Sequence, residues 1–311
     1  MGKKQKNINT IISHFELDKN GFTQSNVDFF NVNLDKDNLA FVDYNRIIKY
    51  SADPLCQSMA DNFRSFLFNL FNYAAKRDTK SGLKILEGIK ECNDTRLGYS
   101  KNNSKGVSIG SVMKPMFLQA LSFLKTAYIN DQISSNTLRY GIDGISYDRI
   151  SDISVSVETQ FLAQYTVDQC KQHNILCESK RRFLVYSVKD KSWHPEVFQL
   201  PEYKGKTIIF IPKKLISSKA KAVCTFAQFM SYGFKNYIKY SDDIQHLKRA
   251  DGKIYYKDYK EYLKKNSISR KRVARGLIES EKDIIFQFEK VRFSDIEDLS
   301  TQDLVAITNR E

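Results

Sequence analysis

A run of apolar residues between positions 53 and 71 constrains the fold more than any other segment of this chain. Apolar side chains recur there at intervals of three and four residues, a spacing that places them on one side of an α-helix. Asp53 and Pro54 precede the run, as is typical of a capping residue and the first helical position. The stripe is rich in phenylalanine and has no Lys or Arg on the same face, so we interpret it as a buried core helix and not as a stacking surface for bases. Its members are Leu55, Met59, Phe63, Phe66, Leu67, Leu70 and Phe71.

The remaining periodicity predicts an α+β fold that is rich in helix. Residues 183–188 and 207–211 are β-branched and aromatic and predict strands. We therefore expect a small central mixed sheet flanked by helices, with Trp193 in a loop. The predicted organisation is a mostly helical region at 1–135, an α/β core at 136–250 and a C-terminal helical region with an acidic tail at 251–311. Further helices are predicted at 81–92, 112–128, 155–173, 219–232, 257–265 and 269–279.

Positive charge is concentrated in one part of the sequence. The 311 residues carry a net charge of +13. Residues 178–275 hold 24 Lys and Arg against 9 Asp and Glu, whereas residues 276–311 hold 4 against 9. Lysine on solvated faces gives such a pattern, and so does a surface that binds nucleic acid. The sequence leaves both interpretations open.

Several classes of protein are disfavoured by composition. The five cysteines are scattered without a C-x-x-C pair, and there are four histidines, so a zinc ribbon or a disulfide scaffold is not expected. No run of eighteen apolar residues occurs, and the N-terminus lacks the apolar centre of a signal peptide. We therefore expect a cytoplasmic protein without a membrane partner.

Acidic residues cluster just before the basic region. Asp143, Asp148 and Asp152 lie within ten residues, and Glu178 follows with Lys180 two positions later. Cleavage of a phosphodiester at neutral pH commonly uses a hard cation held by carboxylate oxygens. We predict that Asp148, Asp152 and Glu178 bind Mg²⁺, with Asp143 in reserve, and that Lys180 is a catalytic residue that orients the attacking water or stabilises the transition state. The alternative is structural: Asp148 pairs with a neighbour or caps a turn, and Asp152 caps the following helix.

Two further segments are candidates for contact with nucleic acid. Residues 262–277 read as a helix-turn-helix, with Ser269 as a cap and a basic outward face, although two packed helices with a solvated face give the same pattern. The glycine-bearing loop at 93–111 precedes a helix and lacks the spacing of a Walker loop, so it is either a surface loop or a phosphate cradle. The predicted nucleic-acid-binding residues are Lys101, Lys105, Arg181, Arg182, Arg270, Lys271, Arg272 and Arg275.

Two resemblances bear on function. Asp148 or Asp152 followed by the Glu178-Ser179-Lys180 triplet resembles the motif of the restriction-endonuclease-like PD-(D/E)xK nucleases, although here a predicted helix separates the two parts. The segments 97–100, 148–152 and 208–213 resemble an uncharacterised bacterial family of defence-island type. These resemblances imply a protein that acts on nucleic acid, expected to be a Mg²⁺-dependent nuclease in bacterial anti-phage defence. The alternative is a non-catalytic nucleic-acid-binding or assembly component that works with a partner protein of a multi-protein defence system.

Overall fold

The apolar run that begins at Leu55 forms the longest helix of the computed structural model, α3 (Pro54–Ala75). The structure describes residues 8–98, 110, 113–124, 133–281 and 283–310. The carboxylate of Asp53 accepts a hydrogen bond from the backbone N–H of Cys56, and Pro54 occupies the first helical turn. The predicted cap and the predicted core helix are both confirmed.

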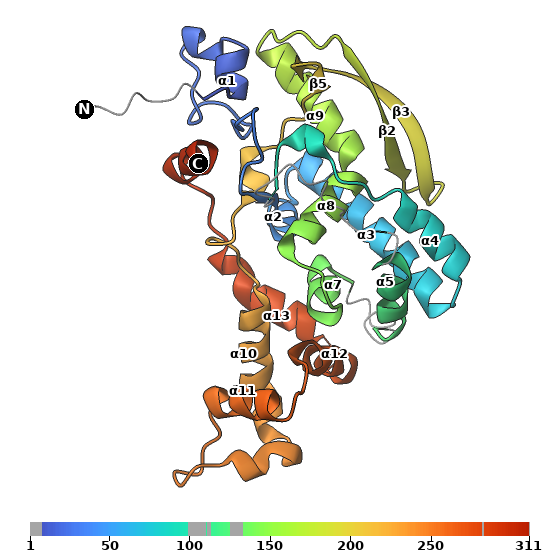
Figure 1. Ribbon diagram of the computed structural model, residues 1–311, viewed down its shortest axis with the longest axis vertical. Helices are drawn as coiled ribbons and strands as arrows, with labels where there is room; N and C mark the ends of the chain where they lie inside the picture. The colour runs from blue at the N-terminus through green and yellow to red at the C-terminus, as the bar shows by residue number, and fades with distance from the viewer. Residues whose placement is uncertain (1–7, 99–109, 111–112, 125–132, 282, 311) are drawn as a thin grey trace, which may run out of the picture.

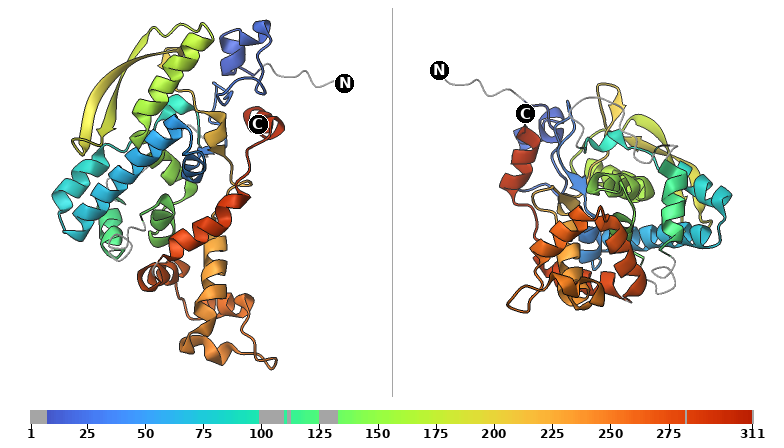
Figure 2. Two further views of the ribbon diagram at one scale, coloured as in Figure 1. Left: turned by 180° about the vertical axis from the view of Figure 1, so that it is seen from behind. Right: turned by 60° about the horizontal axis from the view of Figure 1, so that its bottom comes forward.

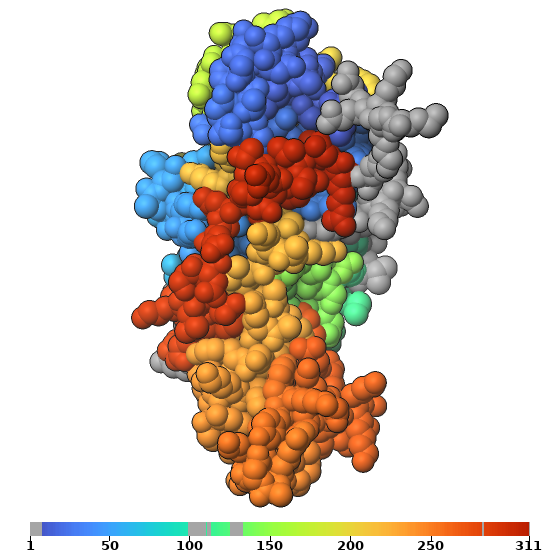
Figure 3. Space-filling model, turned by 90° about the vertical axis from the view of Figure 1, so that its left-hand side faces the viewer, coloured from blue at the N-terminus to red at the C-terminus, as the bar shows by residue number. Residues whose placement is uncertain are grey.

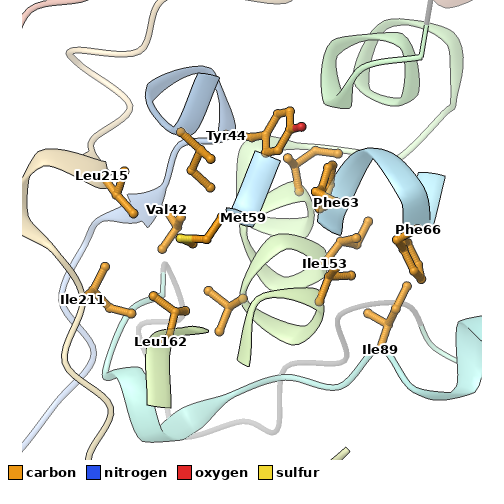
Figure 4. Close-up of a cluster of buried hydrophobic side chains, with 14 of the residues drawn as sticks. Val42, Tyr44, Met59, Phe63, Phe66, Ile89, Ile153, Leu162, Ile211 and Leu215 are labelled. Atoms are coloured by element: carbon orange, nitrogen blue, oxygen red, sulfur yellow. The ribbon is translucent and has the colours of Figure 1, made fainter. Parts of the chain in front are cut away.

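Helices packed around α3 make up the body of the molecule (Figure 1). Its core contains Phe63 and Phe66 of α3 together with Ile153 and Leu162, none of which is exposed (Figure 4). Burial of these large side chains supplies most of the free energy that holds the body together. The body helices are α2 (Tyr44–Lys49), α4 (Thr79–Glu87), α5 (Met113–Ser122), α7 (Ser135–Gly141), α8 (Tyr147–Val157) and α9 (Thr159–Gln172).

The strands form three separate antiparallel pairs within the part of the chain that the structure describes. The longest pair is a hairpin of β2 (Ser179–Ser187) and β3 (Ser192–Leu200). The two short pairs join β1 (Phe41–Val42) to β6 (Ile216–Ser217), and β4 (Glu202–Tyr203) to β5 (Lys206–Thr207). With 55% helix and 11% strand, the predicted helix-rich α+β class is confirmed. The described strands, however, form separate antiparallel pairs in place of the one central mixed sheet that we expected.

Two local predictions about the strands differ from the structure. Trp193 lies on β3 and not in a loop, because its indole N–H donates to the backbone oxygen of Ile85 at 2.7 Å and its ring packs edge-on against Phe66 and Tyr186. The predicted strand at 207–211 contributes only its first residue to a ladder. Its later residues are buried, and the backbone N–H of Phe210 donates to the hydroxyl of Thr166.

A second group of helices extends away from the body (Figures 1 and 2). It consists of α10 (Phe226–Asn236), α11 (Tyr256–Lys265), α12 (Arg270–Ser280) and α13 (Ile284–Arg292), and we call it the helical lobe. Phe234, Ile244, Tyr259 and Leu263 form a small hydrophobic cluster of their own in it. The lobe therefore has an independent packing centre near its outer end.

The C-terminal segment returns to the N-terminal one. Helix α14 (Thr301–Asn309) lies between the N-terminal segment and the lobe in Figure 3. The hydroxyl of Thr308 donates to the backbone oxygen of Asn31 at 2.9 Å. The N-terminal segment contains the short helix α1 (Ile11–His14). Six 3₁₀ turns complete the described elements: η1 (Leu17–Asn20), η2 (Asn93–Thr95), η3 (Lys213–Leu215), η4 (Ile238–Tyr240), η5 (Asp242–Leu247) and η6 (Phe293–Asp295).

None of the helices in the described ranges combines the length and the apolar character needed to cross a lipid bilayer.

Candidate functional site

Asp148 and Asp152 lie on helix α8 and not in a loop before a helix. The helix forms because Ile150, Ile153 and Val157 recur at helical spacing and are buried against the body. Residues four apart on a helix are neighbours on one face, so the two aspartates lie one turn apart on the same face of α8. Both line a small cavity.

A third carboxylate, that of Glu91, lines the same cavity from the segment that follows α4. A fourth, that of Asp37, lies close by: a Cβ atom built on Gly98, which also lines the cavity, would be 3.4 Å from Oδ2 of Asp37. We call this space, together with the four acidic residues Asp37, Glu91, Asp148 and Asp152, the carboxylate cavity. Neither Asp37 nor Glu91 was a predicted site residue, because no motif spacing links them to the aspartates of α8.

Burial raises the pKa of all four carboxyl groups, and neighbouring carboxylates raise it further for Asp37, Glu91 and Asp152. Burial raises the pKa of Asp152 to about 8, and the charges of Asp148 and Glu91 add to this shift. Burial also raises the pKa of Asp148, against the opposing effect of Lys219 and Arg149.

The other two carboxylates behave in the same way. The pKa of Glu91 is raised by burial and then by Asp37 and Asp148. The pKa of Asp37 is raised by burial and by Asp148, although Arg96 lowers it. Clustered like charges with raised pKa values are common at functional sites because each carboxylate disfavours ionisation of the next.

The predicted metal ligands are only partly brought together. Glu178 and Lys180 are exposed at the start of the β2–β3 hairpin, and neither lines the carboxylate cavity. Asp143 is exposed as well and forms an ion pair with Arg275 at 3.5 Å. Across the described residues, no three His, Cys, Asp or Glu side chains are placed, as they stand, to hold a metal ion.

A larger cleft of about 390 Å³ adjoins the carboxylate cavity. Arg181 and Arg182 of β2 line it, and Arg181 lies 3.8 Å from the carboxylate of Asp94. Glu91 and Cys92 line both the cavity and this cleft, so the segment that carries them separates the acidic group from the two arginines. We call this second space the arginine cleft. The predicted contact residues Lys101 and Lys105 lie outside the described residues.

The predicted helix-turn-helix exists as α11 and α12, and the hydroxyl of Ser269 accepts a hydrogen bond from the N–H of Arg272 as its cap. Most of its basic side chains, however, face inward. The ammonium of Lys271 donates to the backbone oxygens of Arg139 and Ile142, and burial lowers its pKa to about 8.

Arg275 and Arg270 are also engaged in packing. Arg275 donates to the backbone oxygen of Gly141 at 3.0 Å, so it and Lys271 both bind carbonyl groups at the C-terminal end of α7. Cations are favourable there because the helix dipole is negative at that end. Arg270 stacks on Phe226, with 5.2 Å from its guanidinium carbon to the ring centre. Of the four predicted nucleic-acid-binding residues on α12, only Arg272 is exposed.

An exposed basic surface lies instead on α11 and the loop before it. Lys257, Lys260 and Lys264 are exposed, whereas Tyr259 and Leu263 on the other side of the helix are buried. Residues 235–272 hold twelve Lys and Arg against five Asp and Glu. We call the exposed lysines of this part of the lobe the basic tip: Lys248, Lys253, Lys257, Lys260, Lys264 and Lys265.

Comparison with known proteins identifies a family over most of the chain. No curated protein and no solved structure matches the sequence. One family does match, described as a domain of unknown function (DUF8370), over residues 20–224. This range includes all four residues of the carboxylate cavity and both arginines of the arginine cleft, and it ends before α10. Because the match covers more than half of the 311 residues, the chain belongs to the DUF8370 family.

Proposed function

We propose that this protein acts on nucleic acid and that the carboxylate cavity is the centre of a divalent-cation-dependent nuclease. The observation that carries the proposal is the convergence of four carboxylates, from three separate parts of the chain, whose pKa values are all raised. A bound Mg²⁺ ion would relieve this repulsion, since hard cations prefer oxygen ligands. The proposed setting, defence against phage, draws on the resemblance to bacterial defence-island families.

Magnesium would require the carboxylates to reorient. As they stand, no three of the described candidate side chains surround a single point. We propose Glu91 as a ligand in place of the predicted Glu178, because Glu91 lines the cavity with Asp148 and Asp152.

The arginine cleft would bind the nucleic-acid backbone beside the carboxylates. Guanidinium groups bind phosphate through paired hydrogen bonds, and contacts of this kind position a strand without reading its sequence. Arg181 and Arg182 line a space that shares Glu91 and Cys92 with the carboxylate cavity. A phosphodiester bound by these arginines would therefore lie next to the acidic group.

A cleavage assay with matched variants tests this proposal. Purified protein is incubated with linear DNA, circular DNA and RNA, with Mg²⁺, with Mn²⁺ and with EDTA. Asp152→Asn and Glu91→Gln should abolish metal-dependent cleavage. Glu178→Gln and Asp143→Asn remove the same charge outside the cavity and should leave cleavage intact. If Glu178→Gln abolished cleavage and Glu91→Gln did not, Glu178 and not Glu91 would belong to the catalytic site.

Metal binding is measured separately from cleavage. Because a cation stabilises ionised carboxylates, Mg²⁺ should raise the melting temperature more at pH 8 than at pH 5. Asp152→Asn should reduce this effect. A melting temperature that is independent of Mg²⁺ and Mn²⁺ at both pH values, together with no cleavage of any substrate, would end the nuclease proposal.

The second candidate function is non-catalytic binding of nucleic acid through the basic tip. Lys257, Lys260 and Lys264 form an exposed row on α11 that could contact successive phosphates. Binding of this kind releases counterions, so the logarithm of affinity falls with the logarithm of salt by about 0.9 for each duplex phosphate contacted.

Replacing these three lysines by Glu should weaken DNA binding and reduce the salt slope by roughly 2 to 3. Lys84→Glu on α4 reverses the charge of an exposed lysine of the body and serves as the control. Binding that keeps its affinity and salt slope in the triple variant would exclude the tip as the contact surface.

A further inference from the structure

A cavity of about 450 Å³ lies where α2 and α3 of the body meet α13 of the helical lobe. Its size falls within the range of roughly 300 to 1,000 Å³ that is usual for small-molecule sites. The cavity shares no lining residue with the carboxylate cavity or the arginine cleft. A ligand bound here would contact both parts of the molecule.

The inner wall carries fixed polar groups. Oε1 of Glu289 accepts hydrogen bonds from the hydroxyl of Ser134 at 2.8 Å and from the amide of Asn136 at 2.7 Å. The same amide of Asn136 donates to Oδ1 of Asn45 at 2.8 Å, and Asn45 is buried. Asn45, Ser134 and Glu289 all line the cavity, so its interior presents an amide, a hydroxyl and a carboxyl group held in place by their neighbours.

The side walls are aromatic and apolar. Tyr44 is buried on one wall, with Ile48 beside it on α2, and Phe293 and Phe286 line the cavity from the lobe side. Phe286 is 65% exposed, so the face of its ring is accessible to a planar ligand.

The rim is charged. Arg64 of α3 and Lys290 of α13 both line the cavity with exposed side chains, and Asp61 lies one turn before Arg64. Both cations line the same cavity, one from the body and one from the lobe, so its rim attracts anionic groups.

From this arrangement we infer that the cavity binds a free nucleoside phosphate. The base stacks on Phe286, its hydrogen-bonding edge meets Asn45 and Glu289, and the phosphate lies at Arg64 and Lys290. The assignment matches each part of the cavity to one part of the ligand: a planar ring, a polar edge and an anion. It is independent of the proposed nuclease activity.

Calorimetric titration of the full chain tests the inference, with AMP, GMP, CMP and UMP as probes and with the matching nucleosides and inorganic phosphate for comparison. At least one monophosphate should bind, and bind more tightly than its nucleoside. Phe286→Ala should weaken that binding by about tenfold or more, because it removes the stacking surface. Lys290→Glu should weaken binding of the monophosphate more than binding of the nucleoside.

Matched controls separate binding at the cavity from changes in folding or overall charge. Phe123→Ala removes another exposed phenylalanine, and Lys84→Glu reverses another exposed lysine; both should bind as the parent protein does. The inference is overturned if no monophosphate binds at millimolar concentration or if both cavity variants bind as the parent does. A clear preference for a 5′-phosphorylated oligonucleotide over every mononucleotide would likewise overturn the assignment to a free nucleotide.

Discussion

At the scale of single residues, the carboxyl group of Asp152 should make stability depend on pH. Its pKa of about 8 in the folded protein lies above the ordinary value of 3.8, because of burial and the charges of Asp148 and Glu91, which Arg149 only partly offsets. Between these two pH values the folded state binds more protons than the unfolded state. The contribution of this carboxyl group to the free energy of unfolding is therefore fully present below about pH 4 and is lost as the pH rises to about 8.

Asp152→Asn should therefore raise the free energy of unfolding at pH 8 by on the order of 1 to 3 kcal/mol and change it little at pH 4. Urea unfolding in EDTA at the two pH values measures the effect. Asp143→Asn is the control, because that side chain is 73% exposed. An equal change at both pH values for Asp152→Asn would show that the carboxylate does not ionise with a raised pKa.

At the scale of elements, the end of α4 and the β2–β3 hairpin meet at one close contact. A Cβ atom on Gly88 would lie 2.1 Å from the ring of Trp193, and the indole N–H is bonded to Ile85. Gly88→Ala should therefore displace the ring and destabilise the protein by about 1 to 3 kcal/mol.

Trp193 is the single tryptophan of the chain, so its fluorescence should shift to longer wavelength in Gly88→Ala. Gly276→Ala on α12 is the matched control, because no atom lies within 4 Å of its added Cβ. In a helix interior that change should stabilise by up to about 1 kcal/mol. Native-like emission and stability in Gly88→Ala would contradict this prediction, because they would show that the hairpin can shift without a loss of stability.

Two adjacent residues of α12 should differ sharply in their effect on stability. Lys271 is bonded to carbonyl oxygens at the end of α7, whereas Arg272 is exposed. Lys271→Ala should lower the free energy of unfolding by about 1 to 3 kcal/mol, because it removes the two hydrogen bonds from Lys271 that hold α12 against the end of α7. Arg272→Ala should change it by less than about 0.5 kcal/mol. Chemical denaturation of the two variants makes the comparison, and similar values for both would contradict the packing of α12 against α7.

Local sequence signals predicted the elements better than the site. The cap and apolar spacing of α3, and the cap of α12 at Ser269, depend on neighbours in sequence, so they could be read from it. The predicted helix at 155–173 corresponds to α9, and most of α8 lies in a segment that the sequence pattern assigns to a loop, because serine and aspartate between its isoleucines obscure the apolar spacing.

The candidate site depends on contacts between distant segments. Asp37 and Glu91 come from loops that carry no motif, and only the packing of the body brings them near Asp148. The basic pattern of α12 could not show which face packs against α7, since Lys271 and Arg275 bind backbone oxygens that no sequence pattern marks. The positions of these charged groups depend on contacts between segments that are far apart in sequence, so local patterns could not predict them.

At the scale of the whole molecule, the C-terminal segment holds a buried charge of the body in place. The side chain of Arg46 on α2 is 1% exposed; its guanidinium lies 3.1 Å from the carboxylate of Asp298 and donates to the backbone oxygen of Glu297. Ile296, Leu299 and Leu304 of the same segment are buried. Loss of the segment would leave Arg46 with one described acceptor, the backbone oxygen of Lys214.

Shortening the chain to end at residue 295 should therefore destabilise the body itself, by about 3 to 5 kcal/mol, since an uncompensated buried charge is costly. Arg46→Met tests the cause. In the full-length chain it removes hydrogen bonds and should destabilise, whereas in the shortened chain it removes an unpaired charge and should recover part of the loss. Thermal and urea unfolding of the four proteins give the coupling between Arg46 and the segment directly. If Arg46→Met costs the same in both chains, the segment acts only through its apolar contacts and the guanidinium does not depend on it.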